Sequence, residues 1–193
     1  MFSQQLLAGR RILVTGGGTG LGKSMAERFL QLGAEVHICG RRKSVCDETA
    51  TELMDLHGGR VVSHRVDIRN AMAVDEMIEA IWTAGPLTDL INNAAGNFIS
   101  RSEDLTPRGF DAVANIVMHG TFYVTHAVGR RWIAAKQRGN VVSITVTWVR
   151  ETKLPAALLM RSVSGPCVKM VWIISSTASG LRMSTPWVVT RPP

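Results

Sequence analysis

The chain has 193 residues, a mass of 21.0 kDa, and 46% hydrophobic and 19% charged residues, which is the size and composition of a compact domain. No stretch reaches the roughly 18 consecutive apolar residues of a membrane-spanning helix, and residues 1–10 lack the apolar core of a secretory signal. Three cysteines without a C-x-x-C spacing indicate neither a disulfide framework nor a zinc knuckle. We therefore expect a cytoplasmic protein with no membrane partner and no metal site.

The net charge of +7 is unevenly distributed. Residues 153–193 hold five basic side chains and no acidic one, so this segment carries +5 and residues 1–152 carry only +2. At the acidic frequency of residues 1–152, the last segment should hold roughly four carboxylates. Its basic residues are scattered and no aromatic side chains interleave with them in a recognition motif, so we expect no nucleic-acid partner.

Short apolar runs alternate with longer helical patterns in residues 1–152, which is typical of a parallel sheet with crossover helices. Strands are predicted over about residues 11–15, 35–39, 60–66, 87–92 and 140–147. Helices are predicted between them, over about residues 21–32, 44–57, 71–84 and 107–138. Ser44 with Asp47 resembles a capping box for the second helix, Asn70 can cap the third, and Thr106-Pro107 opens the fourth.

The fourth helix and the segment after residue 152 differ in how well they can be interpreted. The helix takes its period from apolar residues at Phe110, Val113, Val117, Phe122, Val124 and Ile133. Residues 153–193 have no sustained period, many Ser, Pro and Trp, and a single candidate strand over Val168–Ser175. We therefore divide the chain into a domain over 1–152 and an atypical tail over 153–193.

A glycine-rich segment, Thr15-Gly16-Gly17-Gly18-Thr19-Gly20-Leu21-Gly22, follows the first predicted strand and opens a helix. Glycine permits the tight turn and a close approach of backbone to a pyrophosphate, whose oxygens accept from free N–H groups at the helix start. A flexible surface loop is the alternative, and the register with strand and helix favours the dinucleotide site. The candidate binding residues are Thr15, Gly16, Gly18, Thr19, Gly20, Leu21 and Gly22.

The end of the second strand predicts which dinucleotide is bound. Sites for NAD usually place an acid there to bind the ribose hydroxyls, whereas this chain has Gly40 followed by Arg41-Arg42-Lys43. A guanidinium fork can pair with a 2′-phosphate, so Arg41 is the candidate contact and NADP the expected cofactor. The alternative is that the three basic side chains form a solvated loop.

Two motifs, Thr15-Gly16-x-x-x-Gly20-Leu21-Gly22 and Asn92-Asn93-Ala94-Ala95-Gly96, resemble the short-chain dehydrogenase/reductase family from Arg10 to about Thr152. The resemblance implies an α/β fold, a Rossmann-type doubly wound parallel sheet, here C-terminally incomplete, with residues 1–152 as its NADP-binding domain. It also implies the positions of further cofactor contacts. Asp67 and Ile68 would lie by the adenine, and Asn93, Ala94, Ala95 and Gly96 would line the ribose and nicotinamide.

Three segments are similar to the 2,4-dienoyl-CoA reductase branch of that family, namely residues 92–100, 117–121 and 143–145. This resemblance implies an NADPH-dependent oxidoreductase of fatty acid metabolism that reduces an enoyl- or dienoyl-CoA substrate. It also implies that Asn97 holds the thioester and that Trp148 takes the place of a tyrosine that assists protonation. An indole N–H donates a hydrogen bond but supplies no proton at neutral pH.

One part of the family pattern is missing. Neither Tyr-x-x-x-Lys nor Ser-x-x-x-Lys follows the fifth predicted strand, and the single tyrosine, Tyr123, lies in the fourth helix, where we interpret it as core packing. The rival hypothesis is therefore a catalytically impaired, nucleotide-binding remnant in which the fifth strand is an unpaired edge. We hypothesise that residues 153–193 come from an altered reading frame, an alternative exon or a truncated gene, which sequencing of the source transcript would test.

Two further expectations concern assembly and metals. Members of the family usually form tetramers through their fourth and fifth helices. Because no fifth helix can be predicted from this sequence, a homo-oligomer remains an open expectation. His37, His57, His64, His119 and His126 form no metal-ligand spacing and are interpreted as structural.

Overall fold

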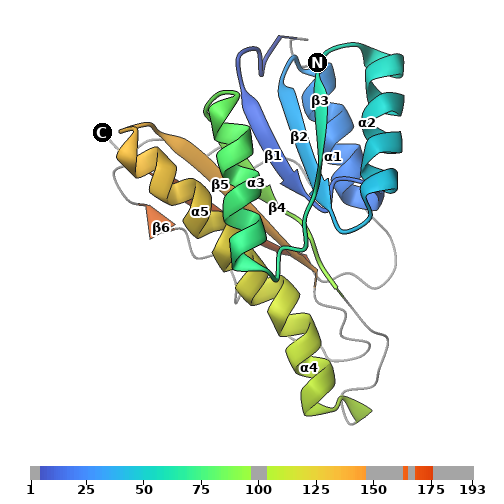
Figure 1. Cartoon of the computed structure of the whole chain (residues 1–193), viewed down its shortest axis with the longest axis vertical. Coiled ribbons are helices and arrows are strands. Elements are labelled where there is room, and N and C mark those ends of the chain that lie inside the picture. The colour runs from blue at the N-terminus through green and yellow to red at the C-terminus, as the bar shows by residue number, and fades with distance from the viewer. Residues whose placement is uncertain (1–4, 97–103, 147–162, 165–167, 176–193) are drawn as a thin grey trace.

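The computed structural model describes residues 5–96, 104–146, 163–164 and 168–175. A sheet with the strand order β3-β2-β1-β4-β5-β7-β6 forms its centre (Figure 1). Five of its strands pair in parallel from β3 to β5. Their bounds are β1 (Arg11–Thr15), β2 (Glu35–Gly40), β3 (Val61–Arg65), β4 (Asp89–Asn92) and β5 (Gly139–Val146). This is the Rossmann-type arrangement expected from the sequence.

Helices cover both faces of the sheet because successive residues of a strand point to opposite sides. On one face, Leu13 of β1 belongs to a core with α3 (Ala71–Thr83) and α5 (Thr121–Ala134). On the other, Ile12 and Val14 of the same strand belong to a core with α1 (Gly20–Gln31) and α2 (Lys43–His57) (Figure 1). The strands are therefore buried on both sides, which explains their continuous apolar runs.

The chain changes direction in the sheet between β1 and β4. From β1 it moves outward through β2 to β3, and it then returns to β4 on the opposite side of β1. Connections that leave neighbouring parallel strands in opposite directions open a crevice at the carboxyl ends of those strands. The ends of β1 and β4 therefore mark where a ligand site is expected.

The strand β7 (Val168–Ser175) coincides with the candidate strand of the tail, and this prediction is confirmed. It pairs in parallel with β5 along the whole of Gly139–Val146, and β6 (Val163–Ser164) pairs antiparallel with β7. The expectation that β5 would be an unpaired edge is thus wrong, since a run rich in β-branched residues supplies a partner strand of equal length. The predicted boundary at residue 152 lies outside the described residues.

Two of the three predicted helix caps are confirmed. The Asn70 side chain accepts from the backbone N–H of Ala73 at 3.1 Å, and Thr106 Oγ1 accepts from that of Gly109 at 3.1 Å. The capping box at Ser44 and Asp47 is wrong, because α2 begins one residue earlier with Arg42 as its N-cap. The Asp47 carboxylate instead accepts from the Lys43 ammonium within α2 and from the Ser63 hydroxyl, and the second contact ties α2 to β3.

The predicted fourth helix is continuous but irregular. It consists of α4 (Pro107–Ala114), a π-helical segment η2 (Asn115–Gly120) and α5. Phe110, Phe122 and Ile133, which helped to define its period, are more than half exposed. The helix is anchored elsewhere, since the fully buried Trp132 donates from Nε1 to the Leu87 carbonyl at 2.6 Å.

A cluster of polar side chains on β1, β2 and β3 surrounds the buried His37. His37 on β2 is 2% exposed, and its Nδ1 lies 3.0 Å from His64 Nε2 on β3. Its Nε2 lies 3.0 Å from the Arg11 guanidinium on β1 and 3.2 Å from the Glu35 carboxylate. Burial lowers the pKa of His37 to about 4, and the charges of His64 and Arg11 act in the same direction. His37 is therefore neutral at pH 7.

We expect a His37→Gln variant to lose less stability than the wild-type chain when the pH falls from 7 to 4. Because the pKa of His37 is lowered on folding from 6.5 to about 4, its contribution is complete above pH 6.5 and is lost as the pH falls through that window. A difference of about 3 kcal/mol in the free energy of unfolding should develop. Urea unfolding at several pH values measures it, with His57→Gln on the surface of α2 as control. Equal acid sensitivity of His37→Gln and wild type would contradict the assignment.

Candidate functional site

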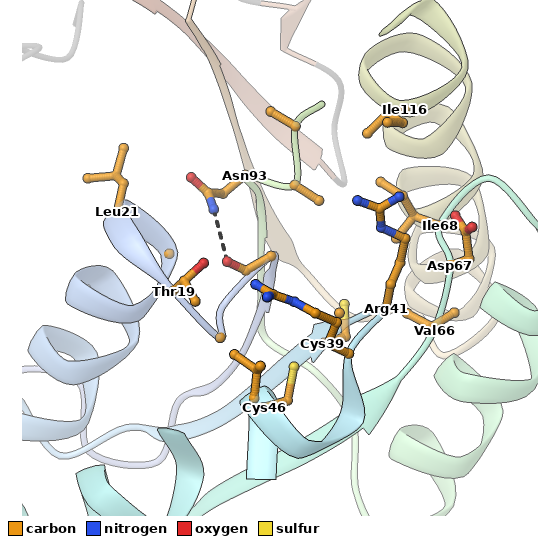
Figure 2. A pocket seen from close by; sticks show the side chains of 18 residues that line it. Thr19, Leu21, Cys39, Arg41, Cys46, Val66, Asp67, Ile68, Asn93 and Ile116 are labelled. Atoms are coloured by element: carbon orange, nitrogen blue, oxygen red, sulfur yellow. Dashed lines mark hydrogen bonds between the residues drawn. The ribbon is translucent and has the colours of Figure 1, made fainter. Parts of the chain in front are cut away.

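A cavity of about 600 Å³ lies at the carboxyl ends of β1, β2 and β4 (Figure 2). It brings together most of the residues that the sequence nominated from four separate segments. Those that line it are Gly16, Gly18, Thr19, Leu21, Gly22, Arg41, Asp67, Ile68, Asn93, Ala94 and Ala95. Thr15, Gly20 and Gly96 do not line it but belong to its supporting turns. The predicted site is therefore one place in the fold, at the crevice that the topology marks.

The glycine turn after β1 leaves no room for a side chain at Gly16 or Gly22. Gly16 has φ +68°, a left-handed conformation that favours glycine, and its N–H donates to the Cys39 carbonyl at 2.8 Å. A Cβ at Gly22 would lie 2.2 Å from the Gly16 carbonyl oxygen and 2.7 Å from Asn93 Nδ2. The first turn of α1 therefore packs directly on the end of β1, and Leu21 and Gly22 of this turn line the cavity.

The ends of β1 and β4 are joined by Thr15 and Asn93. The buried Thr15 Oγ1 accepts from the backbone N–H groups of Asn93 and Ala94, both at 2.9 Å. Asn93 Nδ2 donates back to the Thr15 carbonyl at 3.1 Å. It also donates to the Gly16 carbonyl at 3.4 Å, which is the contact drawn in Figure 2. Thr15 thus supports the floor of the cavity from beneath, whereas the sequence analysis placed it among the direct contacts.

Charged side chains gather at the side of the cavity formed by β2 and the β3–α3 loop. Figure 2 shows the exposed Arg41 on the side where Asp67 and Ile68 lie. Hydrogen bonds from Arg69, followed by the charges of Arg69 and Arg41, hold the pKa of Asp67 below its ordinary value. The cavity therefore offers a carboxylate and a guanidinium next to each other at neutral pH.

The sequence analysis missed several lining residues, among them Cys39, Cys46 and Ile116. Burial raises the pKa of Cys39 to about 12 and also raises that of Cys46. Both are therefore free, protonated thiols at neutral pH. Ile116 sits on η2, and a Cβ at Gly96 would lie 2.2 Å from its Cδ1. Because Ile116 reaches the cavity only through the packing of a distant helix, no local motif marks it.

The two predicted catalytic residues, Asn97 and Trp148, lie outside the described residues. Tyr123 is partly buried and packs against the core, as predicted, but it also lines a polar hollow beside the cavity. In the described part of the chain, no three His, Cys, Asp or Glu side chains cluster in a way that could hold a metal ion. No helix of this part is long and apolar enough to cross a membrane.

Comparison with known proteins agrees with this geometry. The family model described as short chain dehydrogenase matches residues 10–153. The chain belongs to that family. The match ends within two residues of the change in composition at Thr152.

Curated relatives include proteins named as probable 2,4-dienoyl-CoA reductases. A probable 2,4-dienoyl-CoA reductase of Bacillus subtilis is 41% identical over 140 residues, which cover 72% of this chain and 55% of the relative. A probable 2,4-dienoyl-CoA reductase 3 of Caenorhabditis elegans is 42% identical over 146 residues, which cover 75% of this chain and 47% of the relative. The chain thus spans about half the length of the curated relatives it matches.

Solved structures show the same fold. A citronellol catabolism dehydrogenase of Pseudomonas aeruginosa aligns with a TM-score of 0.70 and 32% identity, covering 76% of this chain and 59% of that one. A short chain dehydrogenase of Bacillus anthracis aligns with a TM-score of 0.67 and 40% identity, covering 71% and 55%. A metagenomic short-chain oxidoreductase in complex with NADP aligns with a TM-score of 0.66 and 25% identity, covering 74% and 64%.

Replacing Gly22 by alanine should both destabilise the fold and impair dinucleotide binding. The added Cβ would meet backbone at 2.2 Å, so α1 must move away from β1 at a cost of about 2–4 kcal/mol. Gly129→Ala on α5 is the matched control, because a Cβ there meets nothing within 4 Å, and it should stabilise the helix by about 0.5–1 kcal/mol. Urea unfolding and NADPH fluorescence titration measure both effects. A Gly22→Ala variant that folds and binds as well as Gly129→Ala would contradict the close approach.

Proposed function

We propose that the chain is an NADPH-dependent short-chain oxidoreductase that reduces an enoyl- or dienoyl-CoA substrate by hydride transfer. The assignment of NADPH as cofactor rests on the end of β2, where Gly40 stands in place of the expected acid. Arg41 and Arg42 follow it and line the same cavity as the glycine turn. The substrate class is supported by relatives named 2,4-dienoyl-CoA reductase at 41–42% identity. A neighbour solved in complex with NADP supports the cofactor.

The residues present fit such a cofactor. The N–H groups of the first turn of α1 would bind the pyrophosphate, because the close approach at Gly22 brings them to the cavity. Asp67 and Ile68 would lie by the adenine, and Arg41 would pair with the 2′-phosphate. Asn93, Ala94, Ala95 and Gly96 would form the floor beneath the nicotinamide ribose. When bound, the nicotinamide supplies the hydride, and the chain's own task is to hold the reacting carbon beside it.

The reductase and the rival nucleotide-binding remnant differ in whether the chain can deliver a proton to the substrate. Asn97 would hold the thioester, and Trp148 would stand where the family resemblance implies a tyrosine that assists protonation. Because an indole supplies no proton and the family's lysine motif is absent from the sequence, the second candidate function is a nucleotide-binding remnant without turnover. In both cases we propose a cytoplasmic protein without a nucleic-acid partner, and only the reductase would recognise acyl-CoA.

One titration tests both candidates. NADPH is added to the purified chain while its fluorescence is followed, and a dienoyl-CoA is then added to the same sample while NADPH oxidation is recorded. Binding with turnover supports the reductase, and binding without turnover supports the remnant. Absence of NADPH binding contradicts both.

Replacing Arg41 by alanine should weaken NADPH binding and leave NADH binding nearly unchanged. Only NADPH carries the 2′-phosphate, and a charge-assisted hydrogen bond contributes about 1.5–3 kcal/mol. The ratio of the two dissociation constants should therefore fall by roughly 10- to 100-fold. Arg65→Ala is the control, since Arg65 is an exposed arginine at the end of β3 that does not line the cavity. An unchanged ratio in Arg41→Ala would show that the basic segment is only a solvated loop.

A further inference from the structure

Asp67 is held in one orientation by a residue two positions further along the chain. Arg69 Nε lies 2.9 Å from Asp67 Oδ1 and 3.0 Å from Oδ2, and its terminal nitrogen also donates to Oδ2. The backbone N–H of Arg69 donates to Oδ1 at 3.1 Å. Both oxygens of the carboxylate are therefore engaged by a single residue of the β3–α3 loop.

Arg69 does not line the cofactor cavity. It lines a separate polar hollow of about 410 Å³, whose walls include Asn115, His119 and Tyr123. Among the described residues, Asp67 alone lines both the hollow and the cavity. Asp67 is therefore the residue through which a contact made by Arg69 reaches the cofactor cavity.

The charge of a second guanidinium, that of Arg41, also acts on the same carboxylate. Arg41 lies close enough that its charge, after the hydrogen bonds and charge of Arg69, contributes to lowering the pKa of Asp67. Arg41 and Asp67 also line the same cavity (Figure 2). If Arg69 were removed, Asp67 would be left with Arg41 as its nearest cationic partner. Its uncompensated charge would also face an anion placed at Arg41.

We propose that Arg69 is a positioning residue for cofactor specificity, which holds and neutralises Asp67 so that Arg41 can bind the 2′-phosphate of NADPH. The proposal rests on the proposed function, in which NADPH is the cofactor and Arg41 its phosphate contact. The preference for NADPH over NADH would then depend on the β3–α3 loop as well as on the end of β2. The loop acts by keeping its own carboxylate away from the arginine.

The test compares the NADPH and NADH dissociation constants of four chains by fluorescence titration. Arg69→Met should lower the preference for NADPH about tenfold, the order expected for one uncompensated charge near a surface. Arg65→Met removes the same charge at the end of β3 and should leave the preference nearly unchanged. Adding Asp67→Asn to Arg69→Met should restore the preference, because the competing charge is then gone. Any loss of an adenine contact at position 67 is common to both cofactors and cancels in the ratio.

Two results would overturn the proposal. One is an unchanged ratio in Arg69→Met, and the other is a reduced ratio that Asp67→Asn fails to restore, which would indicate simple damage to the loop. If Arg69→Met does not fold, Arg69→Lys keeps the charge but loses the two-pronged contact, and it should show a smaller shift in the same direction. A preference that is lost in Arg41→Ala but intact in Arg69→Met overturns this inference alone. A wild-type chain without NADPH preference overturns the proposed cofactor as well.

Discussion

The candidate site depends on the hydrogen bonds that join the end of β1 to the end of β4. Parallel strands leave their terminal N–H groups without ladder partners, and a buried N–H without a partner is costly. Here the Thr15 hydroxyl accepts two of these N–H groups, and Asn93 returns a side-chain hydrogen bond to the Thr15 carbonyl. Since Asn93 Nδ2 also occupies the space that a Cβ of Gly22 would need, the same contact holds the start of α1 in place. Strand, turn and helix thus form one rigid wall of the cavity.

A second set of buried polar contacts extends this wall into the rest of the domain. The Asn92 side chain donates to Thr125 of α5 at 2.9 Å and to Ser143 of β5 at 3.3 Å. On the other side, Thr49 of α2 donates to the Gly18 carbonyl at 2.8 Å, within the glycine turn itself. The turn is consequently held from both faces of the sheet, and a ligand meets donors that are already oriented.

The features that could be predicted from sequence are those set by local chemistry. Strands β1 and β2 follow from apolar runs bounded by glycines, and the caps at Asn70 and Thr106 follow from short side chains that reach their own helix start. The predicted capping box does not form, because the Asp47 carboxylate accepts hydrogen bonds from Lys43 and from Ser63, which lies on another element. The exposure of Phe122, the contact of Ile116 with the cavity and the pairing of β7 with β5 depend on how distant segments pack. No periodicity in the sequence carries that information.

The residues proposed to bind the cofactor and those proposed for catalysis lie in different parts of the chain. The proposed contacts for the dinucleotide fall within residues 15–96, on strand ends and turns that the Thr15–Asn93 hydrogen bonds join. The residues proposed for the substrate, Asn97 and Trp148, come after them in the chain. Because β7 covers the edge of β5, the sheet that carries the cofactor contacts does not end in an exposed strand at β5. Binding of the cofactor is therefore a property that this sheet can have whether or not the chain delivers a proton, and the two functions can be lost independently.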